Sequence, residues 1–132
     1  MPGPRTCRAG LAVVALTLLA GCAGVDSRSG EGTPLQSGRA AYYSDAYQGS
    51  RTASGERYDR ASLTAAHRRL AFGTRVRVTN LDNGREVVVR INDRGPFTPG
   101  RVIDLSYRAA QRLDMVASGI APVRLEVVER PR

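Results

Sequence analysis

Apolar and polar residues alternate along two segments of the chain, as they do in strands that bury one face. Within residues 74–80, Val76 and Val78 share one side of the expected strand, and arginine and threonine occupy the other. Within residues 122–128, apolar residues recur at every second position from Val123 to Val127, between arginine and glutamate. The pattern therefore predicts two half-buried strands of the length found in small β domains.

Four other short segments have strand character with less regular alternation. Strands are expected at 39–43, 63–67, 85–91 and 101–105. The dipeptide Asn83-Gly84 stands between two of the expected strands, and Asn-Gly is the strongest short signal for a hairpin. We therefore expect the strands at 74–80 and 85–91 to pair side by side.

One short helix is expected after the strand at 101–105. Ser106 can cap it, and the helix would run through Leu113 with alanines on its buried side. Residues 44–55 are rich in serine, glycine and tyrosine and are expected to form a loop. A mainly β domain of about six short strands and one or two short helices suits a small closed barrel, although periodicity leaves the strand order open.

The first 21 residues have the features of a secretory signal peptide. Two arginines precede an apolar stretch from Leu11 to Ala20, which is too short to cross a bilayer because a spanning helix needs roughly 20 apolar residues. The stretch ends in Leu19-Ala20-Gly21-Cys22, which resembles a bacterial lipobox, in which the cysteine is lipidated. We therefore expect a lipid anchor on Cys22; the alternative is an ordinary signal peptide with a cysteine nearby.

Residues 22–37 are expected to form a lipidated, flexible tether, because the segment is polar and rich in glycine and serine. The folded domain is then expected to span residues 38–130. The residue after Cys22 is alanine rather than aspartate, which, by resemblance to Gram-negative lipoproteins, favours the outer membrane with the domain facing the periplasm. In a Gram-positive cell, the anchor would instead lie in the outer face of the cytoplasmic membrane.

The net charge of the chain indicates a class of partner only when it is combined with the expected export. The 132 residues include 20 basic and 12 acidic ones, every basic residue is arginine, and the formal net charge is +8. An exported chain meets little nucleic acid, so we expect no nucleic-acid partner. The arginines could instead bind a polyanion such as peptidoglycan or a membrane surface. The alternative is that they only form a solvated, arginine-rich face. No His/Cys/Asp cluster has metal-ligand spacing and no glycine-rich phosphate loop is present, so no metal and no cofactor are expected.

Six motifs resemble, in order and over the whole expected domain, the rare lipoprotein A family. They are Gly38-Arg-Ala-Ala-Tyr-Tyr43, Thr52-Ala-Ser-Gly-Glu56, Leu63-Thr-Ala-Ala-His67, Phe72-Gly-Thr-Arg-Val-Arg-Val-Thr-Asn80, Val89-Arg-Ile-Asn-Asp-Arg-Gly-Pro96 and Arg101-Val-Ile-Asp-Leu-Ser106. The resemblance implies a six-stranded double-psi β-barrel. It also implies an endolytic lytic transglycosylase that cleaves peptidoglycan glycan strands, with a preference for strands stripped of stem peptides.

Two features depart from the family pattern. The run Ala41-Tyr42-Tyr43-Ser44 stands where the family usually has Ser-Trp/Tyr-Tyr-Gly, which bears on the fit of substrate at the loop that follows. Many members also carry a C-terminal peptidoglycan-binding domain of the sporulation-related type. We expect none here, and therefore no septal targeting by that route.

Asp93 is the candidate for the general acid that a glycosidic bond needs for its cleavage. It follows the apolar run that ends at Ile91 and precedes a Gly95-Pro96 turn, where a fold can present a side chain to a cleft. The resemblance assigns it the acid and base role. From the residues alone, a turn residue that bonds to the backbone is the favoured interpretation. We expect Arg94 to point away, because a guanidinium beside the carboxyl would hold it ionised.

The resemblance adds Glu56 and His67 to the catalytic group. Glu56 could act on Asp93 through like-charge proximity or stabilise an oxocarbenium ion, and His67 could bond to the sugar or to one of the carboxyls. Their alternatives are a solvated loop glutamate and a structural histidine. Asp104 is expected to be a hydrogen-bonding residue of the barrel or a cap at the helix entry. The residues expected to bind substrate are Tyr42, Tyr43, Tyr47, Ser54 and Arg94, the tyrosines by stacking on sugar rings.

Three functions are compatible with these motifs. The first is a lytic transglycosylase that uses Asp93, Glu56 and His67. The second is a non-catalytic lipoprotein that binds glycan or scaffolds the cell wall, because one fold can host both activities. The third is a hydrolase in which Glu56 and Asp93 form an inverting pair roughly 6.5–9.5 Å apart. Protein partners are not predicted.

Overall fold

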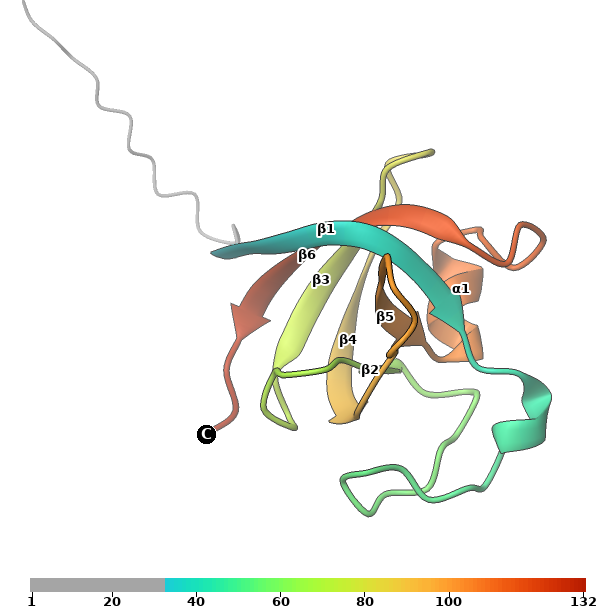
Figure 1. Cartoon of the computed structure of the whole chain (residues 1–132), viewed down its shortest axis with the longest axis vertical. Helices are drawn as coiled ribbons and strands as arrows, with labels where there is room; N and C mark the ends of the chain where they lie inside the picture. Colours follow the sequence, from blue (N-terminus) through green and yellow to red (C-terminus); the bar gives the residue numbers. More distant parts are fainter. Residues whose placement is uncertain (1–32) are drawn as a thin grey trace, which may run out of the picture.

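The computed structural model describes residues 33–132, which form a closed barrel of six strands in the order β1-β5-β2-β4-β3-β6 (Figure 1). The strands are β1 (Thr33–Tyr42), β2 (Thr64–Ala66), β3 (Arg75–Asn80), β4 (Glu86–Asp93), β5 (Arg101–Leu105) and β6 (Ala121–Glu129). The helices are the short 3-10 helix η1 (Asp45–Tyr47) and α1 (Tyr107–Arg112). The prediction of a mainly β, six-stranded barrel with one or two short helices is confirmed.

Parallel and antiparallel neighbours are mixed around the barrel. Strand β1 runs parallel to β5, and β2 runs parallel to β4, whereas the other neighbouring pairs are antiparallel. Strands β3 and β4 form the expected hairpin. Its loop has five residues, 81–85, and Gly84 takes a φ of 79°, a left-handed conformation that glycine adopts without steric cost.

The first strand begins earlier than the sequence predicted. A strand was expected at 39–43, but β1 begins at Thr33, and four of the last five residues of the predicted tether (22–37) therefore pair with β6. Strand pairing is made by the backbone, so a polar, glycine-containing segment can extend β1 wherever β6 offers a free edge. The predicted signal peptide and the lipidation site at Cys22 lie outside the described residues.

The apolar residues of the predicted alternating strands form the core of the barrel. Val76 and Val78 on β3 are fully buried, as are Val123 and Leu125 on β6, which confirms the interior face expected for both strands. Strands β4 and β5 add Val89, Ile91, Ile103 and Leu105. Each fully buried aliphatic side chain contributes about 1.5–3 kcal/mol relative to an exposed one, so this interior is the main source of stability.

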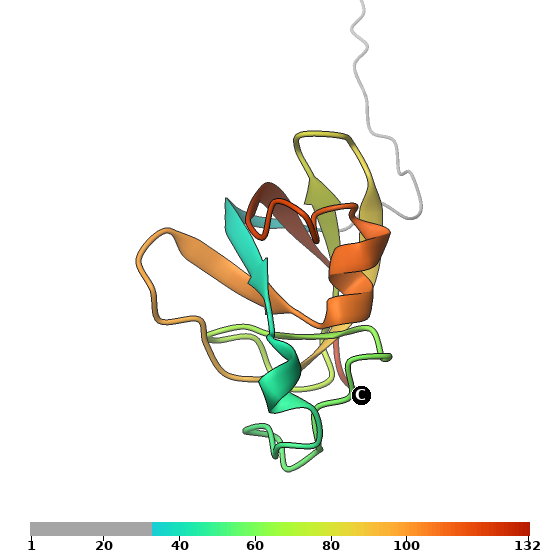
Figure 2. The same ribbon diagram turned by 90° about the vertical axis from the view of Figure 1, so that its right-hand side faces the viewer.

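Helix α1 packs beside the barrel and follows β5 directly (Figure 2). Ser106 caps it as predicted, and its Oγ accepts from the Ala109 amide at 3.3 Å. The buried alanines of the helix and the buried Leu113 join the barrel core. At the other end of the helix, the carbonyl of Leu113 accepts from the Asn80 Nδ2 amide at 2.9 Å, which ties α1 to the end of β3.

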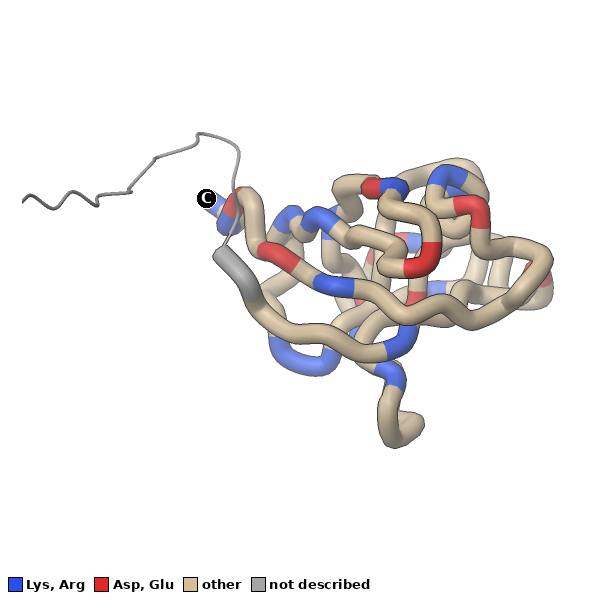
Figure 3. Tube along the Cα trace, turned by 90° about the horizontal axis from the view of Figure 1, so that it is seen from above, with Lys and Arg blue, Asp and Glu red and all other residues tan. Residues whose placement is uncertain are grey.

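Arginines and carboxylates are interspersed along the strands rather than gathered by sign (Figure 3). Arg75 of β3 pairs with Glu129 of β6 at 3.0 Å, and Arg77 lies 4.0 Å from Glu126. The Arg75–Glu129 pair is half-exposed, so it contributes less than about 1 kcal/mol and mainly fixes the polar outer face. Among residues 33–132, no helix has the length and apolar character needed to cross a membrane.

Candidate active site

A β-bulge aims the end of strand β4. Ala65 of β2 faces Ile91, but the next residue, Ala66, faces Asp93, so Asn92 is an extra residue that no β2 residue opposes. Bulges bend a strand and re-aim the side chains beside them. Asp93, the last residue of β4, directly follows the bulge and lines a cleft. The sequence predicted the strand but not the bulge.

Three hydrogen-bond donors hold the Asp93 carboxyl group. Its Oδ1 accepts from the backbone amides of Ala53, at 2.8 Å, and of Arg94, at 2.9 Å. Its Oδ2 accepts from the Tyr43 hydroxyl at 2.6 Å. The Ala53 and Tyr43 donors come from segments 40 and 50 residues away in sequence. The carboxyl therefore joins the end of β1, the loop at residues 52–56 and the end of β4.

Tyr43 is the closest side-chain partner of Asp93. Burial, the hydrogen bond to Asp93 and the negative charge of that carboxyl together raise the pKa of Tyr43 well above its usual value. The hydroxyl therefore stays protonated and acts as a donor. Its ring packs edge-on against Tyr58, with centroids 4.5 Å apart, and lies tilted against Tyr47 at 5.8 Å. The ring stack fixes where the hydroxyl points.

A cleft of about 440 Å³ opens in front of this carboxyl. It is lined by Tyr42, Tyr43, Ser44, Tyr47, Ser50, Arg51, Thr52, Tyr58, Asp93, Arg94, Arg101 and Asp104. Tyr47 is 55% exposed and offers a free aromatic face at the rim, whereas the Tyr42 hydroxyl is bound to the Val116 carbonyl at 2.7 Å. An aromatic rim with a carboxyl at the base suits a sugar, whose ring has apolar faces and polar edges.

Sequence reasoning missed part of this cleft. Arg101 and Asp104 both line it, and they form an ion pair at 2.7 Å. Asp104 lies in β5 and accepts from Arg101, as expected of a hydrogen-bonding residue of the barrel, and the helix cap is Ser106. The sequence did not indicate that Asp104 also lies near enough to Tyr43 to raise the pKa of that tyrosine. Tyr58 was not singled out at all. No periodic pattern marks these positions, since they meet only when β5 closes beside β1.

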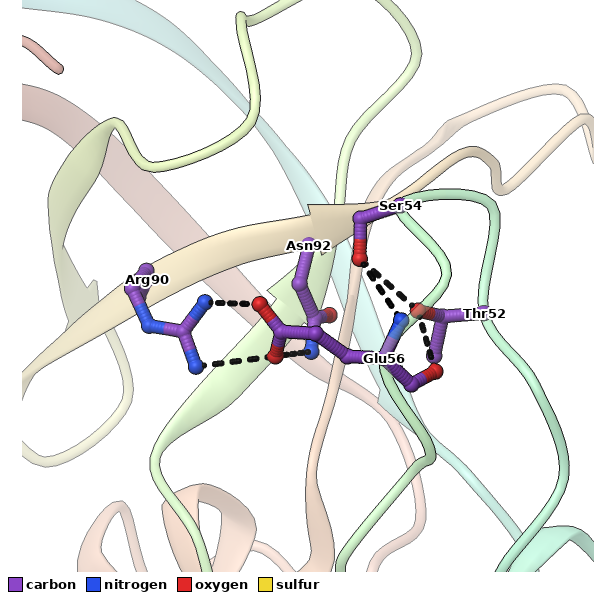
Figure 4. A network of polar contacts seen from close by, with 5 residues as sticks. All are labelled: Thr52, Ser54, Glu56, Arg90 and Asn92. Carbon is purple, nitrogen blue, oxygen red and sulfur yellow. Dashed lines mark hydrogen bonds and ion pairs between the residues drawn. The ribbon is translucent and has the colours of Figure 1, made fainter.

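Glu56 is bound in a separate polar network beside the cleft (Figure 4). Its carboxylate accepts from both terminal nitrogens of Arg90, at 2.6 and 3.0 Å, and from Asn92 Nδ2 at 3.2 Å. The hydrogen bonds from Arg90 lower the pKa of Glu56, so the group is ionised near neutral pH. Glu56 thus anchors its loop to β4, and through Asn92 it holds the bulged residue next to Asp93.

Ser54 lies in the same network rather than in the cleft lining. Its Oγ lies 3.0 Å from the Thr52 hydroxyl and accepts from the Glu56 amide at 3.4 Å (Figure 4). The Ser54 amide donates to the carbonyl of Asn92 at 3.2 Å. The short serine side chain satisfies the polar groups of its own turn, and the expectation that Ser54 contacts substrate stays a prediction.

His67 is buried, with 5% of its surface exposed, and does not face the cleft that holds Asp93. Its Nδ1 accepts from the amides of Arg69 and Leu70 at 3.1 and 3.2 Å, and its Nε2 lies 2.7 Å from Gln36 Oε1. Only the backbones of His67 and Asp93 meet, through a 3.1 Å hydrogen bond. The imidazole bonds to neither carboxyl in the structure, because the turn after β2 uses its acceptor nitrogen. The alternative expectation, that His67 bonds to the sugar, stays a prediction.

Arg94 points away from the Asp93 carboxyl, as predicted. Its guanidinium donates to the carbonyls of His67, at 3.1 Å, and Leu70, at 2.8 Å, and lies 4.1 Å from the centre of the Phe72 ring. Only its backbone amide contacts Asp93. Within residues 33–132, no group of three or more His, Cys, Asp or Glu residues could hold a metal ion.

Comparisons with known proteins agree with this fold. Residues 35–125 match the model of a family described as lytic transglycolase. A Nostoc protein named "Probable endolytic peptidoglycan transglycosylase RlpA" is 63% identical over 95 residues, which cover 70% of this chain and 26% of that protein. A Campylobacter jejuni "Endolytic peptidoglycan transglycosylase RlpA" is 54% identical over 91 residues, which cover 69% of this chain and 33% of that protein.

Solved structures with the same barrel come from proteins with other names. Streptomyces papain inhibitor superposes with a TM-score of 0.57 at 25% identity, covering 71% of this chain and 96% of the inhibitor. A Clavibacter michiganensis expansin superposes with a TM-score of 0.53 at 25% identity, covering 73% of this chain and 51% of the expansin. The chain spans about a quarter to a third of the length of the two curated relatives. With its matched barrel and its six motifs in order, the chain belongs to the lytic transglycolase family of double-psi β-barrel domains.

Proposed function

We propose that this chain is an endolytic lytic transglycosylase, which cleaves the β-1,4 bond between N-acetylmuramic acid and N-acetylglucosamine in peptidoglycan and leaves a 1,6-anhydro end. The observation that carries the proposal is the Asp93 carboxyl, held by three donors at the base of an aromatic-rimmed cleft. The names of the relatives support the substrate. Asp93 serves first as the general acid and then as the general base.

The two oxygens of Asp93 have different roles in this proposal. Oδ1 accepts two backbone N–H bonds, so its lone pairs are occupied and a proton there would face two donors. The acidic proton therefore belongs on Oδ2, the oxygen that Tyr43 contacts. When Oδ2 carries the proton, the Tyr43 hydroxyl can accept from it or turn toward substrate. When Oδ2 is ionised, the same hydroxyl stabilises the carboxylate by donating to it.

The reaction needs no activated water. Asp93 Oδ2 gives its proton to the glycosidic oxygen as that oxygen leaves the anomeric carbon of the muramic acid residue. The C6 hydroxyl of the same residue then forms the new bond to that carbon, and its proton passes to Oδ2. One bond breaks and one forms, the proton returns to the enzyme, and no net charge moves. A single carboxyl is sufficient, in contrast to the pair that a hydrolase uses.

Glu56 has a supporting role in the proposed mechanism. Its ion pair with Arg90 keeps it ionised, which is unsuited to proton donation, and it does not line the cleft. This geometry favours the transglycosylase over an inverting hydrolase, because the second carboxyl of such a hydrolase must activate a water opposite the acid. The negative charge of Glu56 instead holds the loop that delivers the Ala53 amide to Asp93.

The proposal extends to where the enzyme acts and on which strands. The lipobox-like Leu19-Ala20-Gly21-Cys22 supports a lipid anchor on Cys22. The alanine that follows Cys22 supports a place in the outer membrane with the domain in the periplasm. The names of the relatives support cleavage within a glycan strand, which is endolytic cleavage. A preference for peptide-stripped glycan follows from the family resemblance alone.

The test compares products from two substrates. The chain from residue 22 onward, with Cys22→Ser, is incubated with whole peptidoglycan and with peptide-stripped glycan strands, and the released sugars are identified by mass spectrometry. The Asp93→Asn variant is the inactive counterpart, and Asp82→Asn, at the hairpin on the far end of β4, is the matched control. Anhydro-muramyl products that vanish only in Asp93→Asn support the proposal. Hydrated reducing ends would mean a hydrolase, and glycan binding without release would mean a scaffold.

A further inference from the structure

Two loops flank Asp93, and an arginine from each binds the backbone of the other. Arg68, in the loop after β2, donates from Nε to the Pro96 carbonyl and from Nη2 to the carbonyls of Thr98, at 3.0 Å, and Arg101, at 3.3 Å. Arg94, in the loop after β4, donates in the reverse direction to His67 and Leu70. We call Arg68 and Arg94, with the five carbonyls that they bind, the arginine clamp.

The imidazole of His67 fixes the turn that carries Arg68. Its Nδ1 accepts from two consecutive amides, which requires a lone pair there and places the ring proton on Nε2, donating to Gln36. Burial, followed by the charges of Arg94, Arg68 and Arg69, lowers the pKa of His67, so the ring is neutral at neutral pH. A neutral ring without a proton on Nδ1 is the form that this turn needs.

We propose that His67 and the arginine clamp are positioning residues, which hold the backbone of Asp93 so that its carboxyl meets the three donors in the cleft. On one side, the His67 amide donates to the Asp93 carbonyl at 3.1 Å. On the other, the clamp fixes residues 94–101, which leave directly from Asp93. None of these guanidinium or imidazole groups contacts the carboxyl itself. The kinetic part of this inference rests on the proposed function, and the structural part does not.

Guanidinium groups suit this task better than other side chains. Arg68 reaches three carbonyls at once because its donors are spread over a rigid plane, which a lysine ammonium cannot imitate. Arg94 adds a cation–π contact with Phe72, which stiffens the first loop. The arginine clamp affects catalysis through the distance between the Asp93 carboxyl and the bond to be cleaved. A displacement of the acid by about 1 Å costs on the order of 100-fold in rate even when the chemical groups are intact.

The experiment uses the full chain and four variants: Arg68→Ala, Arg68→Lys, His67→Ala and His67→Asn. Asparagine can place its carbonyl oxygen where Nδ1 accepts, so it restores the turn but cannot replace imidazole in acid–base chemistry. Rates on peptide-stripped glycan give kcat and KM. The amide resonances of Ala53 and Arg94, which bond to Asp93 Oδ1, report the position of the carboxyl in 15N-labelled protein. Arg85→Ala, on the hairpin at the opposite end of β4, is the matched control.

We expect Arg68→Ala and His67→Ala to lower kcat about 100-fold with KM unchanged within about twofold, and to shift both amide resonances. Arg68→Lys should lose about tenfold, because it keeps the charge but not the three hydrogen bonds. His67→Asn should keep kcat within about fivefold of the native enzyme, with both resonances in place. Arg85→Ala should match the native chain in every measurement.

Two results would overturn the positioning role. Native kcat and unmoved resonances in Arg68→Ala, or in Arg68→Lys if the alanine variant does not fold, would remove the clamp from the mechanism. His67→Asn as inactive as His67→Ala, with the Ala53 and Arg94 resonances unmoved, would assign the imidazole to the chemistry itself. If the native chain releases no product, the proposed function fails, and the resonances still decide whether the clamp places Asp93.

Discussion

The Tyr43 hydroxyl is the group whose removal tests the active site most directly. Tyr43→Phe deletes one oxygen, which donates to Asp93 Oδ2 at 2.6 Å, and keeps the ring that packs on Tyr58 and Tyr47. The change therefore separates the hydrogen bond from the packing. Tyr43→Ala removes both, and the difference between the two variants gives the contribution of the ring.

The expected magnitude follows from the bond and its surroundings. A hydrogen bond to a charged acceptor contributes about 1.5–3 kcal/mol. Tyr43 and Asp93 are both half-buried, so water can partly replace the lost hydroxyl and the lower end, about 1.5 kcal/mol, applies. If Tyr43 stabilises the carboxylate that forms during proton transfer, the same energy appears in the barrier as a loss of roughly tenfold in kcat. The ring in Tyr43→Ala adds a further loss of stability of about 3 kcal/mol.

The assay measures kcat for anhydro-product release together with urea unfolding for each variant. Tyr42→Phe is the matched control, because it removes a hydroxyl bonded at 2.7 Å to the Val116 carbonyl rather than to Asp93. We expect Tyr42→Phe to lose stability and to keep its kcat, and Tyr43→Phe to lose both. Equal kcat values in Tyr43→Phe and the native enzyme, at unchanged stability, would refute the role given to this hydroxyl.

Two further predictions concern the network around the site and the core beneath it. Glu56→Gln and Arg90→Gln in a double-mutant cycle should show a coupling of about 0.3–1 kcal/mol, since the pair is partly exposed. The folded pKa of Glu56 lies below its ordinary value of 4.5, so this contribution is present above pH 4.5 and is lost as the pH falls through the folded value. Urea unfolding from pH 7 to pH 3 measures the coupling energy. A coupling energy that does not change with pH would contradict the ion pair. Ser106→Ala should cost about 1–3 kcal/mol in urea unfolding, because its buried Oγ donates to the Ser62 carbonyl at 2.6 Å and caps α1; an unchanged midpoint would show that neither bond matters.

The barrel could be predicted from the sequence because its strands carry their own signals. Alternating valines on β3 and β6 specify which face is buried, and Asn83-Gly84 specifies that β3 and β4 are neighbours. These signals are local, so they are readable without knowing the rest of the fold. The early start of β1 was missed because its first residues have little apolar character and are held by backbone pairing with β6.

The sequence indicated the active site only at positions where the residue type and its place in the chain were informative by themselves. Asp93 stood at the end of a strand before a turn, but its partners Tyr43 and Ala53 lie 50 and 40 residues away and meet it only through strand order. The bulge at Asn92 depends on how β2 and β4 align, which periodicity does not encode. The roles of Glu56 and His67 were open for the same reason: a side chain has several chemically suitable partners, and tertiary packing decides which one it meets.

The hydrogen bonds that hold Asp93 determine which substitutions the site tolerates. Two of the three donors to its carboxyl are backbone amides, and the arginine clamp binds only backbone carbonyls. Every residue has a backbone amide or carbonyl, so positions such as Thr98 contribute through their place in the loop rather than through their side chains. Only a few positions then require a particular side chain. They are Tyr43, whose hydroxyl bonds to Asp93, and the two arginines of the clamp, whose guanidinium groups connect the two loops. A carboxyl at the last residue of a strand can therefore be well positioned, provided that the loops on both sides of it are cross-bonded.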